Sequence, residues 1–82
     1  MHLGKRIRLL RKARGLSQRQ LADRAEIFPQ AVSGYEREEY EPSSGTQELI
    51  ALALGVTRQE LLFGDIRELV SAASSPADTV TA

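Results

Sequence analysis

Between Gln18 and Arg37, apolar and aromatic residues follow the spacing of two short helices that pack against each other. The six residues that set this spacing are Leu21, Ala22, Ala25, Ile27, Val32 and Tyr35. Residues three or four positions apart share one face of a helix, so each half of the segment predicts one amphipathic helix. The segment therefore predicts two helices joined by a tight turn, with few exposed residues left on the second helix.

Local signals for helix ends recur on both sides of this segment. Gly15 can adopt the left-handed conformation that ends a helix, and Ser17 with Gln20 forms a capping box that begins one. Pro29 suits a first helical turn because its missing N–H would have no intrahelical acceptor there. The expected helices span about residues 3–14, 17–24, 29–36, 45–54 and 57–63, with a possible sixth helix after Asp65.

These signals predict an all-α protein with one compact domain. A chain of 82 residues has room for one small core. We expect residues 1–64 to form a compact five-helix domain and residues 65–82 to form a short helix and a flexible tail. The tail is expected from Ser74 onward, where the sequence is small, polar and interrupted by Pro76.

Composition excludes several classes of function. The chain has no cysteine and a single histidine, His2, which argues against disulfides, thiolate chemistry and zinc sites. We find no paired catalytic carboxylates and no phosphate-binding loop, so we expect no enzyme activity, no cofactor and no metal. The longest apolar run, residues 49–56, is too short to span a membrane. The N-terminal residues lack the order of charge, apolar core and cleavage site that is typical of a signal peptide, so none is expected. A cytoplasmic location is expected.

A net charge of zero conceals a strong asymmetry between the two halves of the chain. Residues 1–37 carry nine basic side chains against three acidic ones, whereas residues 38–82 carry two against eight. Salt screens charges more than roughly 8 Å apart, so a polyanion would respond to the local basic surface. The alternative is that these basic residues only solvate the first helix.

Four stretches in order along residues 3–63 resemble one family: RIRLLRKARGLSQRQLA, AVSGYER, PSSGT and LALGVTRQELL. They are similar to the phage-repressor and Cro-type family of helix-turn-helix proteins, also called the XRE family. The resemblance implies a repressor-like fold with the helix-turn-helix at the second and third helices. It also implies a sequence-specific regulator of transcription that binds double-stranded DNA, expected to be a repressor.

Matching positions carry family roles over to this chain. Gln18 matches a glutamine that contacts a phosphate and supports the recognition helix. Arg11 and Glu36 match an ion pair between the first and third helices, and Tyr35 matches an aromatic core position. Arg14, Arg19 and Arg37 are further candidates for phosphate contacts, and positive charge at these places would make binding sensitive to salt.

The positions that would read bases depart from the family pattern. Pro29 and Gly34 stand where relatives often carry polar or basic side chains, which leaves Gln30 and Ser33 as the main reading residues. Gln30 could contact an adenine edge in two places. Phe28 could touch a thymine methyl or fill a hydrophobic staple at the helix entrance, and we favour the staple. The predicted base-contacting set is Phe28, Pro29, Gln30, Ser33 and Gly34.

Three further features stand out in this region, and two of them leave alternatives open. Gly34 could let its backbone approach DNA closely, or could simply weaken the helix. Glu26 stands at the turn, where relatives favour glycine in a left-handed conformation. Glu38, Glu39 and Glu41 would repel phosphates if their loop faces DNA, and would only solvate the surface if it turns away.

Surplus apolar residues in the second half of the chain predict an interface with another protein. The predicted homodimer contacts are Leu49, Leu52, Phe63, Ile66, Leu69 and Val70. Alternatively, residues 66–70 fold back and cover Leu49 and Leu52 within one chain. The same surface also suits an antitoxin or an interaction adaptor whose partner is a toxin or another regulator.

Overall fold

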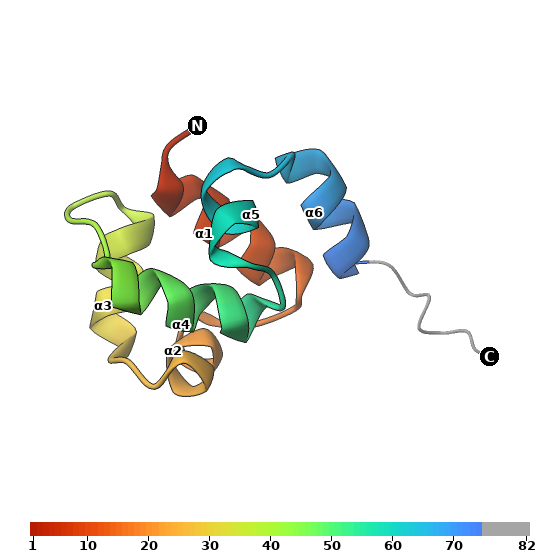
Figure 1. Ribbon diagram of the computed structural model, residues 1–82. Helices are drawn as coiled ribbons and strands as arrows, with labels where there is room; N and C mark the ends of the chain where they lie inside the picture. The colour runs from red at the N-terminus through yellow and green to blue at the C-terminus, as the bar shows by residue number, and fades with distance from the viewer. Residues whose placement is uncertain (75–82) are drawn as a thin grey trace.

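The computed structural model describes residues 1–74, and these form six helices with no strand among them (Figure 1). The helices are α1 Leu3–Ala13, α2 Gln18–Ala25, α3 Pro29–Glu36, α4 Ser44–Leu54, α5 Arg58–Phe63 and α6 Ile66–Ser74. The prediction of an all-α fold with five helices and a possible sixth is confirmed. Within the described range, no helix is long and apolar enough to cross a membrane. Residues 75–82, most of the predicted flexible tail, lie outside the described residues.

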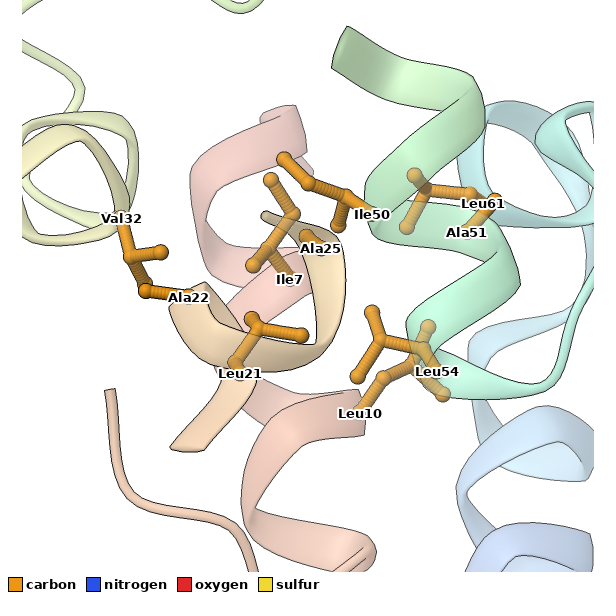
Figure 2. Packing of buried hydrophobic residues seen from close by; sticks show 10 residues of the cluster. All are labelled: Ile7, Leu10, Leu21, Ala22, Ala25, Val32, Ile50, Ala51, Leu54 and Leu61. Atoms are coloured by element: carbon orange, nitrogen blue, oxygen red, sulfur yellow. The ribbon is translucent and has the colours of Figure 1, made fainter. Parts of the chain in front are cut away.

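The core is built from side chains of five helices that meet at one point (Figure 2). Ile7 and Leu10 of α1 pack against side chains of α2 and α4, and none of the large aliphatic side chains in this cluster is measurably exposed. The buried cluster comprises Ile7, Leu10, Leu21, Ala22, Ala25, Val32, Ile50, Ala51, Leu54 and Leu61. Burial of these aliphatic side chains is the main force that holds α2 and α3 in a fixed relation to the other helices.

Helix α1 is the central element, because α3, α4, α5 and α6 all pack against it. In Figure 1, α2 and α3 lie on one side of the molecule and α6 lies on the opposite side. Gly4 lets α1 approach the end of α3 closely, since a Cβ there would overlap the backbone carbonyl of Tyr35. The helix-turn-helix therefore rests directly on the backbone of α1.

Four of the helices end in a left-handed residue, and two of these residues are glutamates. Gly15 and Gly55 end α1 and α4 as expected for glycine, with φ of 72° and 77°. Glu26 ends α2 with φ of 60°, which confirms the left-handed turn expected there. Glu38 follows α3 and is also left-handed, with φ of 62°. The sequence predicted only an acidic loop at this position and no left-handed residue. The chain therefore has a glutamate with a strained, left-handed backbone shortly before α3 and another shortly after it.

The basic residue Arg6 has a structural role that its sequence context does not reveal. It is 8% exposed and donates hydrogen bonds from Nε to the Leu61 carbonyl (2.5 Å) and from Nη2 to the Gly64 and Glu60 carbonyls (2.6 and 3.0 Å). These carbonyls lie at the C-terminal end of α5, where intrahelical donors run out. Arg6 thus caps α5, and its buried guanidinium is not available for contacts at the surface.

Helix α6 folds back onto α1 rather than over α4. Ile66, Leu69 and Val70 are half-buried against the edge of the core. Leu49 and Leu52 of α4 remain 42% and 77% exposed, so the alternative in which residues 66–70 cover them is wrong. The apolar face of α6 packs against α1. The division of the chain into residues 1–64 and 65–82 stays a prediction.

Candidate nucleic-acid interface

The outward face of α3 carries the residues that could read a nucleic acid. Gln30, Ser33 and Arg37 lie three or four positions apart and share this face. Gln30 and Arg37 are exposed, and Ser33 is half-buried. Pro29 is the first residue of the helix, as expected from its missing N–H. Two of the predicted reading residues, Gln30 and Ser33, are therefore brought together at the surface.

A buried ion pair fixes the angle at which α3 presents that face. Glu36 accepts hydrogen bonds from Arg11 Nε at 2.7 Å, from Arg11 Nη2 at 3.0 Å and from Gln18 Nε2 at 3.1 Å. Arg11 Nη1 also donates to the Leu16 carbonyl at 2.8 Å. The side chains of Arg11 and Glu36 are only 10% and 4% exposed. The predicted ion pair and the supporting role of Gln18 are confirmed, while its phosphate contact stays a prediction.

The exposed side chain of Arg37 forms hydrogen bonds with two neighbouring residues, Glu39 and Ser33. Its Nε and Nη2 donate to the two carboxylate oxygens of Glu39, each at 3.0 Å, and its Nη1 donates to the Ser33 hydroxyl. The hydrogen bond and the positive charge of Arg37 lower the pKa of Glu39, and the pKa of Arg37 is raised in return. A depressed carboxyl pKa keeps Glu39 ionised at neutral pH, so the pair is lost only as pH falls through that pKa. Glu39 thus occupies Arg37 where a phosphate could bind it.

A groove between α1 and α3 adds two basic residues that our sequence analysis did not select. Arg8 and Lys12 of α1 are exposed and line this groove together with Gln18, Ser33 and Arg37. Residues 8 and 12 lie one turn apart on α1, one on each side of Arg11. The sequence did contain a signal for them. Arg8 lies three positions before Arg11 and Lys12 lies one position after it, so both flank the helix face that the ion pair places against α3.

Arg14 and Arg19 differ in their surroundings, although both were predicted to contact phosphates. Arg19 is exposed in the first turn of α2, beside Gln18. Arg14 donates from Nε to the Leu54 carbonyl at 2.9 Å and lies against Gly55, at the C-terminal end of α4. Arg14 therefore caps α4, much as Arg6 caps α5, and this contact favours a structural role.

Phe28 does not fill the hydrophobic staple that we favoured. It is the N-cap residue of α3 and is 79% exposed. A staple uses the residue before the N-cap, and that residue, Ile27, packs against the cluster that contains Val32. The staple prediction was therefore wrong by one position, and the aromatic ring of Phe28 is left at the surface near the start of α3.

Gly34 is buried by a residue from outside α3. A Cβ at Gly34 would overlap the ring and hydroxyl of Tyr40, and no other residue supplies the nearest atoms. With Tyr40 in this position, the Gly34 backbone is covered, which argues against its predicted contact with DNA. The glycine makes room for a tyrosine, which was neither of the two readings open from the sequence.

The surface predicted to form a dimer divides into two parts. Leu52 and Phe63 are 77% and 79% exposed, and Leu49 is 42% exposed. Ile66, Leu69 and Val70 are half-buried against α1 and the core. The exposed part comprises only Leu49, Leu52 and Phe63, and the dimer itself stays a prediction.

Comparison with known proteins places the chain in a family. Residues 7–61 match the family model described as Helix-turn-helix. The immunity repressor protein of Bacillus phage phi105 is 43% identical over 56 residues, which cover 68% of this chain and 39% of that protein. The P22 c2 repressor protein, crystallised in complex with synthetic operator 9T, has a TM-score of 0.73 and 32% identity over 79% of this chain and 98% of that one. This chain belongs to the phage-repressor (XRE) type of helix-turn-helix family, a family of DNA-binding transcription regulators.

Proposed function

We propose that this protein is a sequence-specific repressor of transcription that binds operator DNA in the cytoplasm as a homodimer. The observation that carries the proposal is the exposed face of α3, fixed by the Arg11–Glu36 pair beside the N-terminus of α2. In helix-turn-helix proteins the second helix lies in the major groove and the first crosses the backbone. The likeness to a repressor crystallised with its operator supports the same arrangement here.

In this arrangement the residues divide between two tasks. Gln30 and Ser33 would contact base edges, with Pro29 and the exposed ring of Phe28 at the start of the helix. Phosphate contacts would come from Gln18 and from the exposed basic residues Arg8, Lys12 and Arg19. Arg37 would join them only when it leaves its ion pair with Glu39. Base contacts give specificity, and phosphate contacts give affinity that falls with salt.

The dimer would double a small reading surface. Few side chains on α3 can hydrogen-bond a base, so one copy would discriminate weakly between sequences. A two-fold dimer would present two α3 helices about 34 Å apart, one turn of DNA, to a palindromic site. Leu49, Leu52 and Phe63 are the exposed apolar residues available for that contact.

Selection of bound sequences from random DNA tests the proposal. The wild type is expected to select a palindrome, and Gln30→Ala is expected to lose preference at one base pair of each half-site. The discrimination lost at that pair should be roughly 1–3 kcal/mol, since a glutamine can contact an adenine at two atoms. Gln59→Ala, an exposed glutamine on α5, is the matched control and should leave the motif unchanged. A wild type that selects no motif would refute the proposed function.

Removing the charge of Glu39 should increase affinity for DNA. Glu39→Gln keeps the shape of the side chain but releases Arg37 from its ion pair, so that Arg37 can bind a phosphate. Each phosphate that is neutralised releases counterions, so the plot of log affinity against log salt should steepen by about 0.9. Fluorescence anisotropy with labelled operator at several salt concentrations measures both quantities.

The control for this variant must change the net charge equally without touching the groove. Glu68→Gln does so, because Glu68 is exposed on α6, on the other side of the molecule from α3 (Figure 1). Its affinity and salt dependence should stay close to those of the wild type. If the two variants behave alike, only net charge matters, and the Arg37–Glu39 pair has no role in DNA binding.

A further inference from the structure

The reading face of α3 has a gap at Gly34, one turn after Gln30, and another part of the chain fills it. Gly34 has no side chain, and the atoms nearest to the place where its Cβ would stand belong to the ring and hydroxyl of Tyr40. Tyr40 therefore occupies the space in which a side chain at position 34 would begin. Its ring lies on the same stripe of α3 as Gln30 and Ser33.

Tyr40 is held firmly in this place although it lies in a loop. Its hydroxyl donates to the backbone carbonyl of Gln30 at 3.2 Å, and its ring meets that of Tyr35 edge to face, with centroids 5.5 Å apart and planes at 87°. The left-handed Glu38 turns the chain back over α3, and Glu39 N–H donates to the Gly34 carbonyl at 3.0 Å. Two contacts and a fixed turn thus position the ring.

Tyr40 is also accessible, since half of its surface is exposed. A purely structural tyrosine needs only ring contacts, whereas this one brings a polar atom to the outward face of a helix. The hydroxyl proton is used by the Gln30 carbonyl, and the oxygen retains acceptor capacity. In the major groove, adenine N6 and cytosine N4 are the amino groups that can donate to such an acceptor.

We propose that Tyr40 is a specificity-determining residue that reads DNA in place of the missing side chain at Gly34. This inference rests on the proposed function, because it requires α3 to lie in the major groove. The Tyr40 oxygen accepts a hydrogen bond from an adenine or cytosine amino group. The base pair it reads is different from the pair read by Gln30, because the hydroxyl stands one helical turn further along α3, beside Gly34.

Tyr40→Phe is the direct test, because it removes the oxygen and keeps the ring over Gly34. In selection from random DNA, Tyr40→Phe is expected to lose about fivefold preference for adenine or cytosine at one base pair of each half-site. Tyr35→Phe is the matched control, since no hydrogen bond from its hydroxyl is present in the described residues, and its motif should equal that of the wild type. Circular dichroism of each variant checks that the helices are retained.

A second variant moves the reading group back onto α3. Tyr40→Ala combined with Gly34→Gln opens the space over α3 and fills it from the helix itself. This double variant is expected to select adenine at the same base pair at which Tyr40→Phe loses its preference, because glutamine pairs with an adenine edge. That result would show that a side chain at position 34 and the hydroxyl of Tyr40 reach the same base pair. It would support the inference even if Tyr40→Phe had only a small effect.

Three results would overturn the inference. A Tyr40→Phe motif identical to the wild type, with no adenine gained by the double variant, would mean that Tyr40 only packs against α3. Loss of preference at the same base pair that Gln30→Ala affects would mean that Tyr40 orients Gln30 and contacts no base. A wild type without any motif would refute the proposed function itself, whereas the first two results leave that function intact.

Discussion

Glu36→Ala should lower the free energy of unfolding by about 3–5 kcal/mol, because it removes one partner of a buried ion pair. The Glu36 carboxylate accepts three hydrogen bonds, two from Arg11 and one from Gln18. Without it, the guanidinium of Arg11 keeps a single acceptor among residues 1–74, the Leu16 carbonyl, although the Arg11 side chain is only 10% exposed in the wild type. Urea unfolding followed by circular dichroism measures the loss.

A double variant separates the value of the pair from the cost of an unpaired charge. Arg11→Met with Glu36→Leu replaces both partners by apolar groups of similar size and should recover most of the stability lost in Glu36→Ala. Its DNA affinity should nevertheless be lower than that of the wild type, because Gln18 and α3 lose the carboxylate that joins them. A loss below about 1 kcal/mol for Glu36→Ala, typical of surface pairs, would contradict the burial of this pair.

Arg6→Met should lower the free energy of unfolding by about 3 kcal/mol, because it removes the side-chain donor from three carbonyls at the end of α5, of which only that of Glu60 also accepts the Gly64 N–H. Helix α5 has only six residues, so it depends on this contact more than a long helix would. The cation also lies where the helix dipole is negative. Thermal unfolding should show a melting temperature lower by roughly 12–24 °C.

Two control variants test whether the hydrogen bonds of Arg6 cause this loss of stability. Arg8→Met removes an exposed arginine from the same helix and should change stability by no more than about 0.5 kcal/mol. Arg6→Lys keeps the charge but cannot reach three carbonyls from one ammonium group, so it should recover only part of the loss. Equal stability of Arg6→Lys and wild type would show that charge alone matters, and that the directed hydrogen bonds do not.

The ends of the helices could be predicted because their causes are local. Ser17 with Gln20 and Thr57 with Glu60 form capping boxes, as their spacing of three residues predicts. Gly15 takes the left-handed conformation that follows from its lack of a Cβ. These signals involve residues within one turn of each other, so the sequence contains both partners in one short segment.

The partners of Arg6, Arg14 and Tyr40 could not be predicted in the same way. The carbonyls that Arg6 contacts lie 54 to 58 residues away along the chain, and that of Arg14 lies 40 away. Backbone carbonyls leave no signal in a sequence, because every residue has one. The pairing of Arg11 with Glu36, also distant, was expected only from the resemblance to a family. Tyr40 left a weak local signal, a glycine within a helix with an aromatic residue six positions later.

The hydrogen bonds that several arginines make within the chain have a consequence for how the protein would search DNA. Four guanidinium groups donate hydrogen bonds to carbonyls or carboxylates of the chain itself, those of Arg6, Arg11, Arg14 and Arg37. Affinity for random DNA grows with the number of phosphates that are neutralised, and it sets how long a protein stays on each wrong site. With these four arginines engaged, we expect the chain to dwell only briefly on most of a genome. It would reach its operator by many short visits, and the ion pair of Arg37 with Glu39 would help to set their length.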